Sequence, residues 1–412
     1  MAAAINPFRP SIMLGLKGFI AAAIGGLGSS TGAILGGLLL GLAEAYTAGY
    51  ISSDYKDGAL RADSDHSVFP AQRLAGQPGR GACVMATVKT HRKAPGLIAL
   101  FVVLAVAPLL AANDFHYDLM IKICLIASVA VGLNLLVGYA GQVSLGHAAF
   151  YAGGAYASAL LTQNYEFTPL PAMLTAAVAV GVLAWLVGRP ILHLKGHYLS
   201  MATLGLGVIA AIVINNEDQV TGGPDGLPVA PLSVFGHELS VFGSYEWFGI
   251  TVTGTQLWYL LAAGGLFLAV WLALNLIDSP LGRALRALHG SEIAAQVAGV
   301  DTAKYKLRVF VISAIYASVA GSLYAHYSGF ITPDIASFGH SIELITIVVL
   351  GGMASTYGVI LGAAILLLIP QFLTGFQELE MVLFGAILMV VMIFMPRGLV
   401  PTIARRFQKE AA

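Results

Sequence analysis

Apolar segments long enough to approach a bilayer crossing recur along this chain, with short polar stretches between them. A transmembrane helix needs roughly 20 mainly apolar residues. In lipid a spanning segment must satisfy its own backbone hydrogen bonds, and these segments are far longer than barrel strands. We therefore predict an all-α polytopic membrane protein with roughly 8–10 transmembrane helices, some of them broken at glycines. The expected helices lie near residues 97–112, 117–138, 145–162, 170–188, 198–214, 256–277 and 309–327, followed by a glycine-interrupted pair near 341–375 and a last helix near 381–395.

The composition supports this class and excludes several others. Only 10% of the residues are charged and 58% are hydrophobic, so polar side chains are too few to cover a water-facing surface. Lys+Arg and Asp+Glu balance at 21 each, which argues against a nucleic-acid partner bound through bulk positive charge. Cys83 and Cys124 are the two cysteines, without a CxxC pair or a His/Cys cluster. We expect neither a disulfide scaffold nor a metal site.

The positions of Lys and Arg predict the orientation, because cytoplasmic loops carry the excess of these residues. Basic residues precede the first helix and recur in the long loop 278–308, which we place inside. The connection 215–251 contains five acidic residues and no basic one, so we place it outside. Basic residues also follow the last helix, and the segment 341–375 must therefore leave the membrane on the side that it entered. We expect a re-entrant hairpin or two short crossings there.

The N-terminal region differs from the rest of the chain. Residues 25–36 align without gaps on residues 351–362, with seven of twelve positions identical. Residues 1–58 therefore look like a glycine-rich hairpin from the end of a related protein. Residues 59–84 mix charges with scattered glycines, and we expect them to be a disordered junction. Residues 85–412 form the predicted main transmembrane domain, with Met85 as a plausible natural start of that domain.

The predicted inner loop carries the strongest motif. It reads Glu-x-Ala-Ala-x-x-x-Gly from Glu292 to Gly299, between two basic flanks. We expect a short helix over 292–298, in which Ala294 and Ala295 permit close approach to a soluble partner and Gly299 ends the helix in a left-handed conformation. An ordinary amphipathic loop helix is the alternative. The spacing resembles the coupling helix of ABC importer permeases, which transmits motion from an ATPase subunit.

A second motif combines glycines with polar side chains at a predicted helix boundary. Glycines at 138, 141 and 146 permit an unwound backbone there, and neighbouring side chains offer hydrogen-bonding groups. Transporters commonly bind substrate charges at such exposed helix ends, although tight helix packing explains small residues equally well. The candidate pathway residues are Gly141, Gln142, Ser144, Gly146, His147, Thr203, Gly205, Gly351 and Gly352. Glu343, in a predicted membrane segment, is expected in the first turn of its helix, where the helix dipole favours a carboxylate.

Five segments in a specific order give residues 85–412 a family resemblance. They are 138–150 (GYAGQVSLGHAAF), 195–205 (KGHYLSMATLG), 221–226 (TGGPDG), the Glu292 loop and the Gly351 hairpin. Together they resemble branched-chain amino-acid ABC transporter permeases of the LivM type, which have relatives for urea and amides. Residues 1–58 instead resemble the end of a companion LivH-type permease, and 59–84 match neither.

The resemblance implies a non-enzymatic permease subunit in a bacterial inner membrane. Its partners would be a LivH-type sister permease, two ABC ATPase subunits and a periplasmic substrate-binding protein, and its cargo leucine, isoleucine and valine. The chain has no nucleotide-binding motif, so ATP would bind the partner subunits and no cofactor is expected here. Thr221, Gly222, Gly223 and Asp225 would face the binding protein, unless they form a plain loop. Urea or short amides as cargo, or a stand-alone secondary transporter, remain the alternatives.

Overall fold

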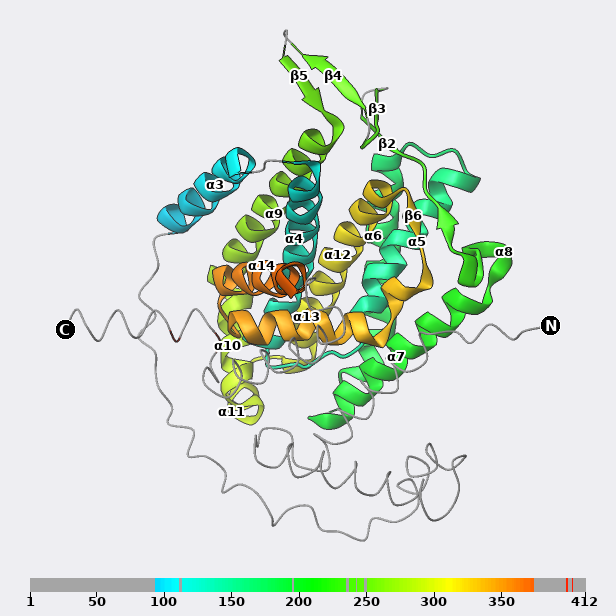
Figure 1. The fold of residues 1–412 in the computed structure, drawn as a ribbon. Helices are drawn as coiled ribbons and strands as arrows, with labels where there is room; N and C mark the ends of the chain where they lie inside the picture. Colours follow the sequence, from blue (N-terminus) through cyan, green and yellow to red (C-terminus); the bar gives the residue numbers. More distant parts are fainter. Residues whose placement is uncertain are drawn as a thin grey trace, which may run out of the picture. The chain divides into compact units, whose positions relative to one another are not determined.

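The computed structural model describes residues 93–110, 113–194, 196–234, 237–241, 243–247 and 250–373, together with positions 398 and 402 (Figure 1). The predictions for residues 1–84 and for a helix near 381–395 lie outside this part of the chain. The long helices are α3 (Lys93–Leu110), α4 (Asp114–Asn134), α5 (His147–Asn164), α6 (Pro169–Ile191), α7 (His197–Asn216), α9 (Gly254–Asp278), α12 (Thr302–Ser328), α13 (Phe338–Gly351) and α14 (Thr356–Leu373). Among the described residues, the predicted helices between 97 and 373 are confirmed within a few residues, except that α12 begins seven residues before the predicted start at 309.

Shorter elements connect these helices. A π-helical turn, η3 (Leu135–Tyr139), continues α4, and the other short helices are α8 (Asp218–Thr221), η4 (Gly223–Asp225), α10 (Pro280–Gly290), α11 (Glu292–Val297) and η5 (Pro333–Ala336). Three antiparallel strand pairs occur among the described residues. They are β1 (Leu227–Pro228) with β6 (Phe330–Ile331), β2 (Leu232–Val234) with β3 (His237–Leu239), and β4 (Ser244–Trp247) with β5 (Ile250–Thr253).

Five of the described helices are long and apolar enough to cross a membrane. They are Asp114–Tyr139, Pro169–Ile191, Tyr198–Asn216, Gly254–Asp278 and Thr302–Ser328, and three shorter apolar helices accompany them. The all-α polytopic class is thus confirmed. Figure 1 shows α4, α6, α9 and α12 upright, with the strand pair β4–β5 at one end and α10 and α11 at the other. The connection predicted to lie outside and the loop predicted to lie inside are therefore at opposite ends of the upright helices.

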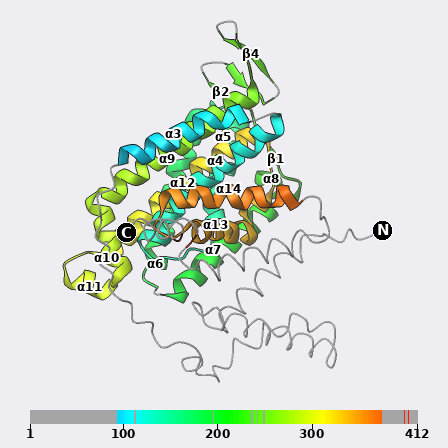
Figure 2. The same ribbon diagram turned by 60° about the vertical axis from the view of Figure 1, so that its left-hand side comes forward.

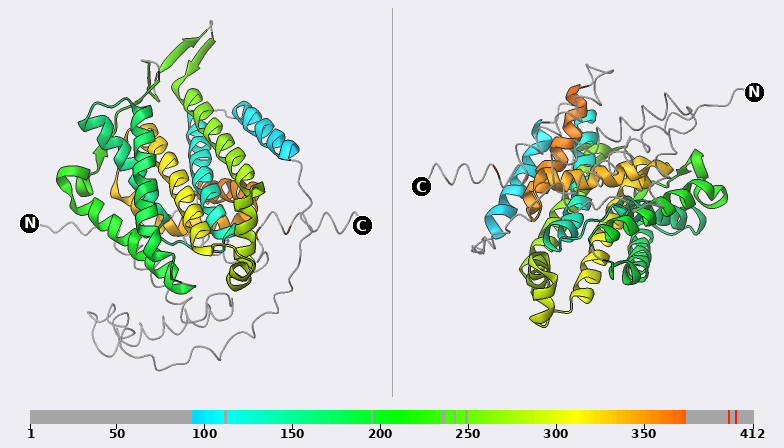
Figure 3. Two further views of the ribbon diagram at one scale, coloured as in Figure 1. Left: turned by 180° about the vertical axis from the view of Figure 1, so that it is seen from behind. Right: turned by 90° about the horizontal axis from the view of Figure 1, so that it is seen from below.

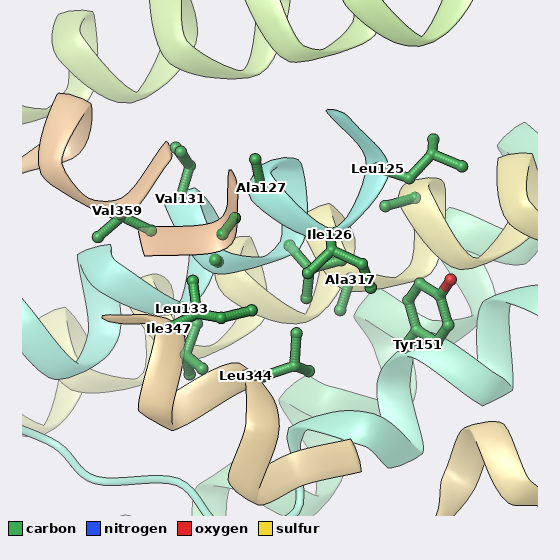
Figure 4. Packing of buried hydrophobic residues seen from close by; sticks show 14 of the residues in the cluster. Leu125, Ile126, Ala127, Val131, Leu133, Tyr151, Ala317, Leu344, Ile347 and Val359 are labelled. Atoms are coloured by element: carbon green, nitrogen blue, oxygen red, sulfur yellow. The ribbon is translucent and has the colours of Figure 1, made fainter. Parts of the chain in front are cut away.

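Helices α13 and α14 run across this upright group, and Figures 2 and 3 show the same crossing from other sides. The predicted break between them is confirmed, because α13 ends at Gly351 and α14 begins at Thr356. Both helices pack on α4 through apolar side chains. Figure 4 shows Leu133 of α4 close to Ile347 of α13, within one continuous buried cluster.

Helix α12 lies at the centre of the packing, against α4, α5 and α6. Glycines allow α5 and α12 to approach closely. A Cβ atom on Gly154 would lie 2.2 Å from the Ser318 carbonyl oxygen, and one on Gly321 would lie 2.0 Å from the Tyr151 carbonyl oxygen. In lipid, where water exclusion contributes little to helix association, such close van der Waals packing is a main source of stability.

The substitution Gly321→Val should lower the stability of the folded permease by about 1–3 kcal/mol or more, because its side chain would overlap the α5 backbone. The measurement is the melting temperature of the detergent-solubilised protein. Gly264→Val in α9 is the matched control, since a Cβ atom there meets nothing within 4 Å. Equal melting temperatures for the two variants would contradict this account of the α5–α12 contact.

Candidate functional site

Two non-helical segments interrupt the helix group, and the end of α4 and η3, just before the first of them, contact the second. The first break, residues 140–146, separates η3 from α5, and Gly141 within it has a φ of +69°. The second break, residues 352–355, separates α13 from α14. The Tyr139 hydroxyl donates a hydrogen bond to the Ala354 carbonyl oxygen at 2.8 Å. The Ala354 amide in turn donates to Asn134 Oδ1 at 3.0 Å. Two segments more than 200 residues apart in the chain therefore form one polar junction.

Glycine is required where η3 touches the second break. A Cβ atom on Gly138 would lie 2.3 Å from the Ala354 backbone nitrogen. The backbone of the second break turns through Gly352, with a φ of +108°, and through Ala354, with a φ of +62°. A non-glycine residue at positive φ is uncommon and costs free energy, so the two hydrogen bonds to Ala354 offset a strained conformation.

The end of the first break, where α5 begins, lies near the middle of a spanning helix. His147 Nε2, at the end of the first break, lies 2.8 Å from the hydroxyl of Ser313, which is near the middle of α12. The Ala148 amide donates to the Ser341 hydroxyl of α13 at 3.1 Å. Non-helical backbone at membrane depth is tolerated only where protein or a wet cavity surrounds it. Both breaks satisfy that condition through contacts with neighbouring helices.

Helix α7 covers another side of the first break. The Leu145 amide donates to Thr203 Oγ1 at 3.1 Å, and the Ser200 hydroxyl donates to the Val143 carbonyl oxygen at 3.2 Å. The structure thus brings Thr203 to the predicted pathway segment. It does not bring Gly205 into a tight contact, because a Cβ atom there would meet nothing within 4 Å. Gly207, which is not among the predicted pathway residues, makes the close approach to Gly146 instead.

Several polar atoms of the first break are buried without a hydrogen-bond partner in the described part of the chain. They are both amide atoms of Gln142, the hydroxyl of Ser144 and Nδ1 of His147. Buried polar groups are nearly always paired, since an unsatisfied one costs about 1–3 kcal/mol. Their concentration in one segment is typical of a functional site that a ligand or water completes. All three residues are among the pathway residues that the sequence predicts.

Glu343 does not lie where we expected. Its helix, α13, begins at Phe338, so Glu343 is beyond the first turn and the dipole of the helix N-terminus is not its main partner. Its Oε2 lies 3.1 Å from Nδ1 of His340, one turn earlier on the same helix. The prediction was wrong because the helix begins at Phe338, three residues before the apolar segment predicted from 341.

The predicted helix in the inner loop is confirmed as α11. The Ser291 hydroxyl accepts a hydrogen bond from the Ala294 amide at the start of the helix, and Gly299 follows its end with a φ of +82°. Glu292 points back to α12, where its Oε2 lies 2.8 Å from Lys306 Nζ. Ala295 is buried and Ala294 is exposed. The motif residues therefore split between holding α11 in place and forming its surface.

The outward surface of α11 is apolar, a feature that the motif did not indicate. Ile293 is 73% exposed and Val297 is 86% exposed, and they lie four residues apart on one side of the helix. The available signal was an apolar pair at helical spacing in a loop with basic flanks. Lys306 was also missed, because nothing in the linear pattern relates it to Glu292.

The 221–226 segment forms a tight turn in the structure. Thr221 is buried, and its Oγ1 lies within hydrogen-bonding distance of the carbonyl oxygens of Ile214 and Glu217. Gly222 and Gly223 have positive φ values, and both meet neighbouring atoms so closely that no side chain fits. Asp225 is exposed. Of the four residues predicted to face a binding protein, Asp225 offers a side chain to solvent, and the other three build the turn that presents it.

Asn134→Ala should lower the melting temperature, because it removes the acceptor of the part-buried Ala354 hydrogen bond and costs about 0.5–1.5 kcal/mol. Asn216→Ala, at the exposed end of α7, is the control. A melting temperature that stays at the wild-type value in Asn134→Ala would mean that this hydrogen bond does not hold the second break.

Among the described residues, no group of three or more His, Cys, Asp or Glu side chains is placed to hold a metal ion. The free Cys124 is buried in α4. The site is therefore built from unwound backbone, amide, hydroxyl and imidazole groups. Such groups bind a small polar or zwitterionic solute through hydrogen bonds and helix-end dipoles.

The comparisons with known proteins agree with this geometry. The family model described as "Branched-chain amino acid transport system / permease component" matches residues 116–392, which include both breaks and the inner loop. The high-affinity branched-chain amino acid transport system permease protein LivM of Escherichia coli (strain K12) is 35% identical over 321 residues, 74% of this chain and 74% of the relative. LivH of the same organism is 27% identical over 289 residues, 66% of this chain and 90% of the relative.

A further relative is named for another solute. The ribose import permease protein RbsC of Escherichia coli (strain K12) is 30% identical over 293 residues, 68% of this chain and 84% of the relative. No solved structure is significantly similar to the chain. The family model covers more than half of the chain, and a LivM protein is more than 30% identical over 74% of it. The chain therefore belongs to the family of branched-chain amino acid transport system permease components, and it is a multi-pass membrane protein.

Proposed function

We propose that this chain is the LivM-like permease subunit of a bacterial inner-membrane ABC importer for leucine, isoleucine and valine. The observation that carries the proposal is the contact between η3, just before the first break, and the second break, together with the unpaired polar groups on Gln142, Ser144 and His147. Discontinuous helices around a mid-membrane site are the common device by which transporters bind polar solutes. The LivM and LivH relatives support branched-chain amino acids as that solute.

The energy for import would come from partner subunits. The chain contains no nucleotide-binding motif, so ATP would bind two separate ABC ATPase subunits, and this chain would need no cofactor. Helix α11 has the features of the contact with such a subunit. Its exposed Ile293 and Val297 form an apolar pair suited to a groove, while the Glu292–Lys306 ion pair anchors the helix to α12. Motion of the ATPase would then pass through α12 to the first break.

The remaining partners follow from the two faces of the molecule. A periplasmic binding protein would deliver substrate at the outer connection, where Asp225 is exposed. A LivH-type sister permease would complete the pathway, with substrate passing between the two chains along the breaks at 140–146 and 352–355. Small residues at these breaks would allow the backbone to approach the solute closely.

The test is reconstitution of the complete importer in proteoliposomes with its binding protein. ATP-dependent uptake of radiolabelled leucine, absent without ATP or without the ATPase subunits, would support the proposal. Uptake of urea and acetamide is measured alongside, because urea and short amides are the alternative cargo. Uptake of ribose is measured because the relative RbsC is a ribose import permease. ATP-dependent uptake of one of these solutes in place of leucine would show that the importer carries that solute. Leucine movement by this chain alone, without ATP, would overturn the ABC role in favour of a secondary transporter.

Reversing one charge of the Glu292–Lys306 pair should uncouple transport. Glu292→Lys places two ammonium groups together where the Lys306 side chain is only 8% exposed, so α11 loses its anchor. We expect ATP-driven uptake to fall on the order of tenfold, equivalent to about 1.4 kcal/mol. The double variant Glu292→Lys with Lys306→Glu should recover most of the uptake. Lack of recovery in a folded double variant would mean that Glu292 acts on the ATPase directly.

The exposed apolar pair gives a separate prediction about assembly. Ile293→Asp combined with Val297→Asp should release the ATPase subunits, because the charges would be desolvated in an apolar groove. The measurement is recovery of ATPase subunits with the affinity-purified permease. The melting temperature of the permease itself should not change, since both side chains point to solvent. Ala287→Asp, at an exposed position of α10, adds charge to the same loop outside α11 and is the control. Full recovery of the ATPase with the double aspartate variant would exclude this surface as the contact.

A further inference from the structure

Two carboxylates of the helix group differ in their partners. Asp118 of α4 has a cationic partner, because its Oδ2 lies 2.8 Å from Lys122 Nζ, and its Oδ1 accepts from the Tyr327 hydroxyl at 2.6 Å. Glu343 of α13 has no lysine or arginine within ion-pair distance among the described residues. Its Oε2 lies 3.1 Å from His340 Nδ1, and its side chain is 41% exposed. Glu343 is thus a carboxylate that this chain leaves without a strong cation.

Glu343 lies at membrane depth. Two residues before it on α13, the Ser341 hydroxyl accepts from the Ala148 amide at 3.1 Å. Ala148 follows His147, whose Nε2 lies 2.8 Å from the Ser313 hydroxyl near the middle of α12. Two helical residues advance α13 by about 3 Å, so Glu343 remains close to this level. A carboxylate at such depth is costly against hydrocarbon and instead faces protein or water.

The exposed side of α13 also differs in composition from a side that suits lipid. On α6, Leu174, Val178 and Val182 repeat every four residues and are each more than half exposed, so one side of that helix is apolar. On α13, Thr346 follows Glu343 by one turn and is likewise partly exposed. The side of α6 is therefore suited to lipid, and the polar side of α13 is suited to water or a protein partner.

The position of α13 relates this polar side to both breaks. The helix ends at Gly351, where the second break begins, and its Ser341 binds the start of α5, where the first break ends. Glu343 lies on the helix between these two points. In the proposed importer, substrate passes between the two permeases along both breaks. A polar helix side that joins the breaks and does not suit lipid fits the wall of that passage.

We propose that Glu343 lines the passage between the two permeases and binds the ammonium group of the amino acid that crosses it. The ligand rests on the proposed function, because a neutral cargo would bring no cation. His340 holds Oε2, while Oε1 makes no hydrogen bond among the described residues and can accept from an ammonium group. A lysine or arginine of the sister permease is the competing cation, and the experiments separate the two.

The first measurement tests whether this side of α13 meets water in the complete importer. A membrane-impermeant methanethiosulfonate reagent labels a thiolate, which forms in water and not in lipid. Thr346→Cys is placed in a chain that carries Cys83→Ser and Cys124→Ala, and it should be labelled. Val178→Cys, on the apolar side of α6, is the matched control and should stay unlabelled. No labelling of Thr346→Cys while the importer hydrolyses ATP would overturn the proposal.

The second measurement tests for contact with the cargo. Leucine-loaded binding protein with ATP should slow labelling of Thr346→Cys severalfold relative to ligand-free binding protein with ATP, because leucine occupies the passage one turn away. Adding Glu343→Gln removes the charge and keeps the side-chain shape, so this leucine-dependent protection should disappear. Protection of the same size with and without Glu343→Gln would overturn the proposal.

The third measurement is leucine uptake at saturating loaded binding protein. Glu343→Gln should lower ATP-driven uptake on the order of tenfold, the effect of losing a hydrogen bond to a charged group. The melting temperature and the recovery of the sister permease with the affinity-purified chain should not change. Glu166→Gln, exposed in the connection between α5 and α6, is the matched control and should keep uptake. Loss of the sister permease in Glu343→Gln would show that Glu343 pairs with that subunit, and would overturn the proposal.

The two proposals fail differently. Leucine uptake at the unmodified rate in Glu343→Gln disproves the role of Glu343 and leaves the cargo in place. ATP-driven uptake of urea or ribose in place of leucine disproves the cargo, and the ammonium contact with it.

Discussion

The hydrogen-bonding requirement of backbone buried in a membrane governs this structure. A continuous helix satisfies its own amides and carbonyls, but the chain leaves the helical state twice within the spanning region, at residues 140–146 and 352–355. Side chains of neighbouring helices replace part of the backbone hydrogen bonds that a continuous helix would make. Asn134 accepts from the Ala354 amide, Thr203 from the Leu145 amide and Ser341 from the Ala148 amide. The polar residues of α4, α7 and α13 are therefore structural partners of the breaks.

Close packing allows those partners to reach the backbone. Glycines at 138, 146 and 321 lie where another chain segment passes within a distance that excludes any side chain. Hydrogen bonds from short side chains such as Ser and Thr require that proximity, so the small residues and the polar residues act together. The unpaired groups of Gln142, Ser144 and His147 are buried within this close packing.

The inner half of the molecule connects the breaks to a helix outside the spanning region. Glu292 and Lys306 hold α11 against the first turns of α12, and α12 contacts the first break through Ser313 and His147. One packed path thus leads from the exposed Ile293 and Val297 to the segment with the unpaired polar groups. An applied displacement of α11 can reach that segment without an unfolded linker between them. Mechanical continuity of this kind is what a permease driven by another subunit needs.

Hydrophobic segment length determined the helices, because twenty apolar residues in lipid have few alternatives, and glycine placement determined both breaks and the stop after α11. The sequence also identified Gln142, Ser144 and His147 as a group, since they are adjacent in one short segment. Other features were decided by tertiary structure alone. The contact of Tyr139 with Ala354, the pairing of Glu292 with Lys306 and the role of Gly207 in place of Gly205 all depend on distances between helices. A linear pattern specifies which face of a helix is apolar, but not which neighbour that face meets or how closely, and those distances decide where polar groups are left to bind a solute.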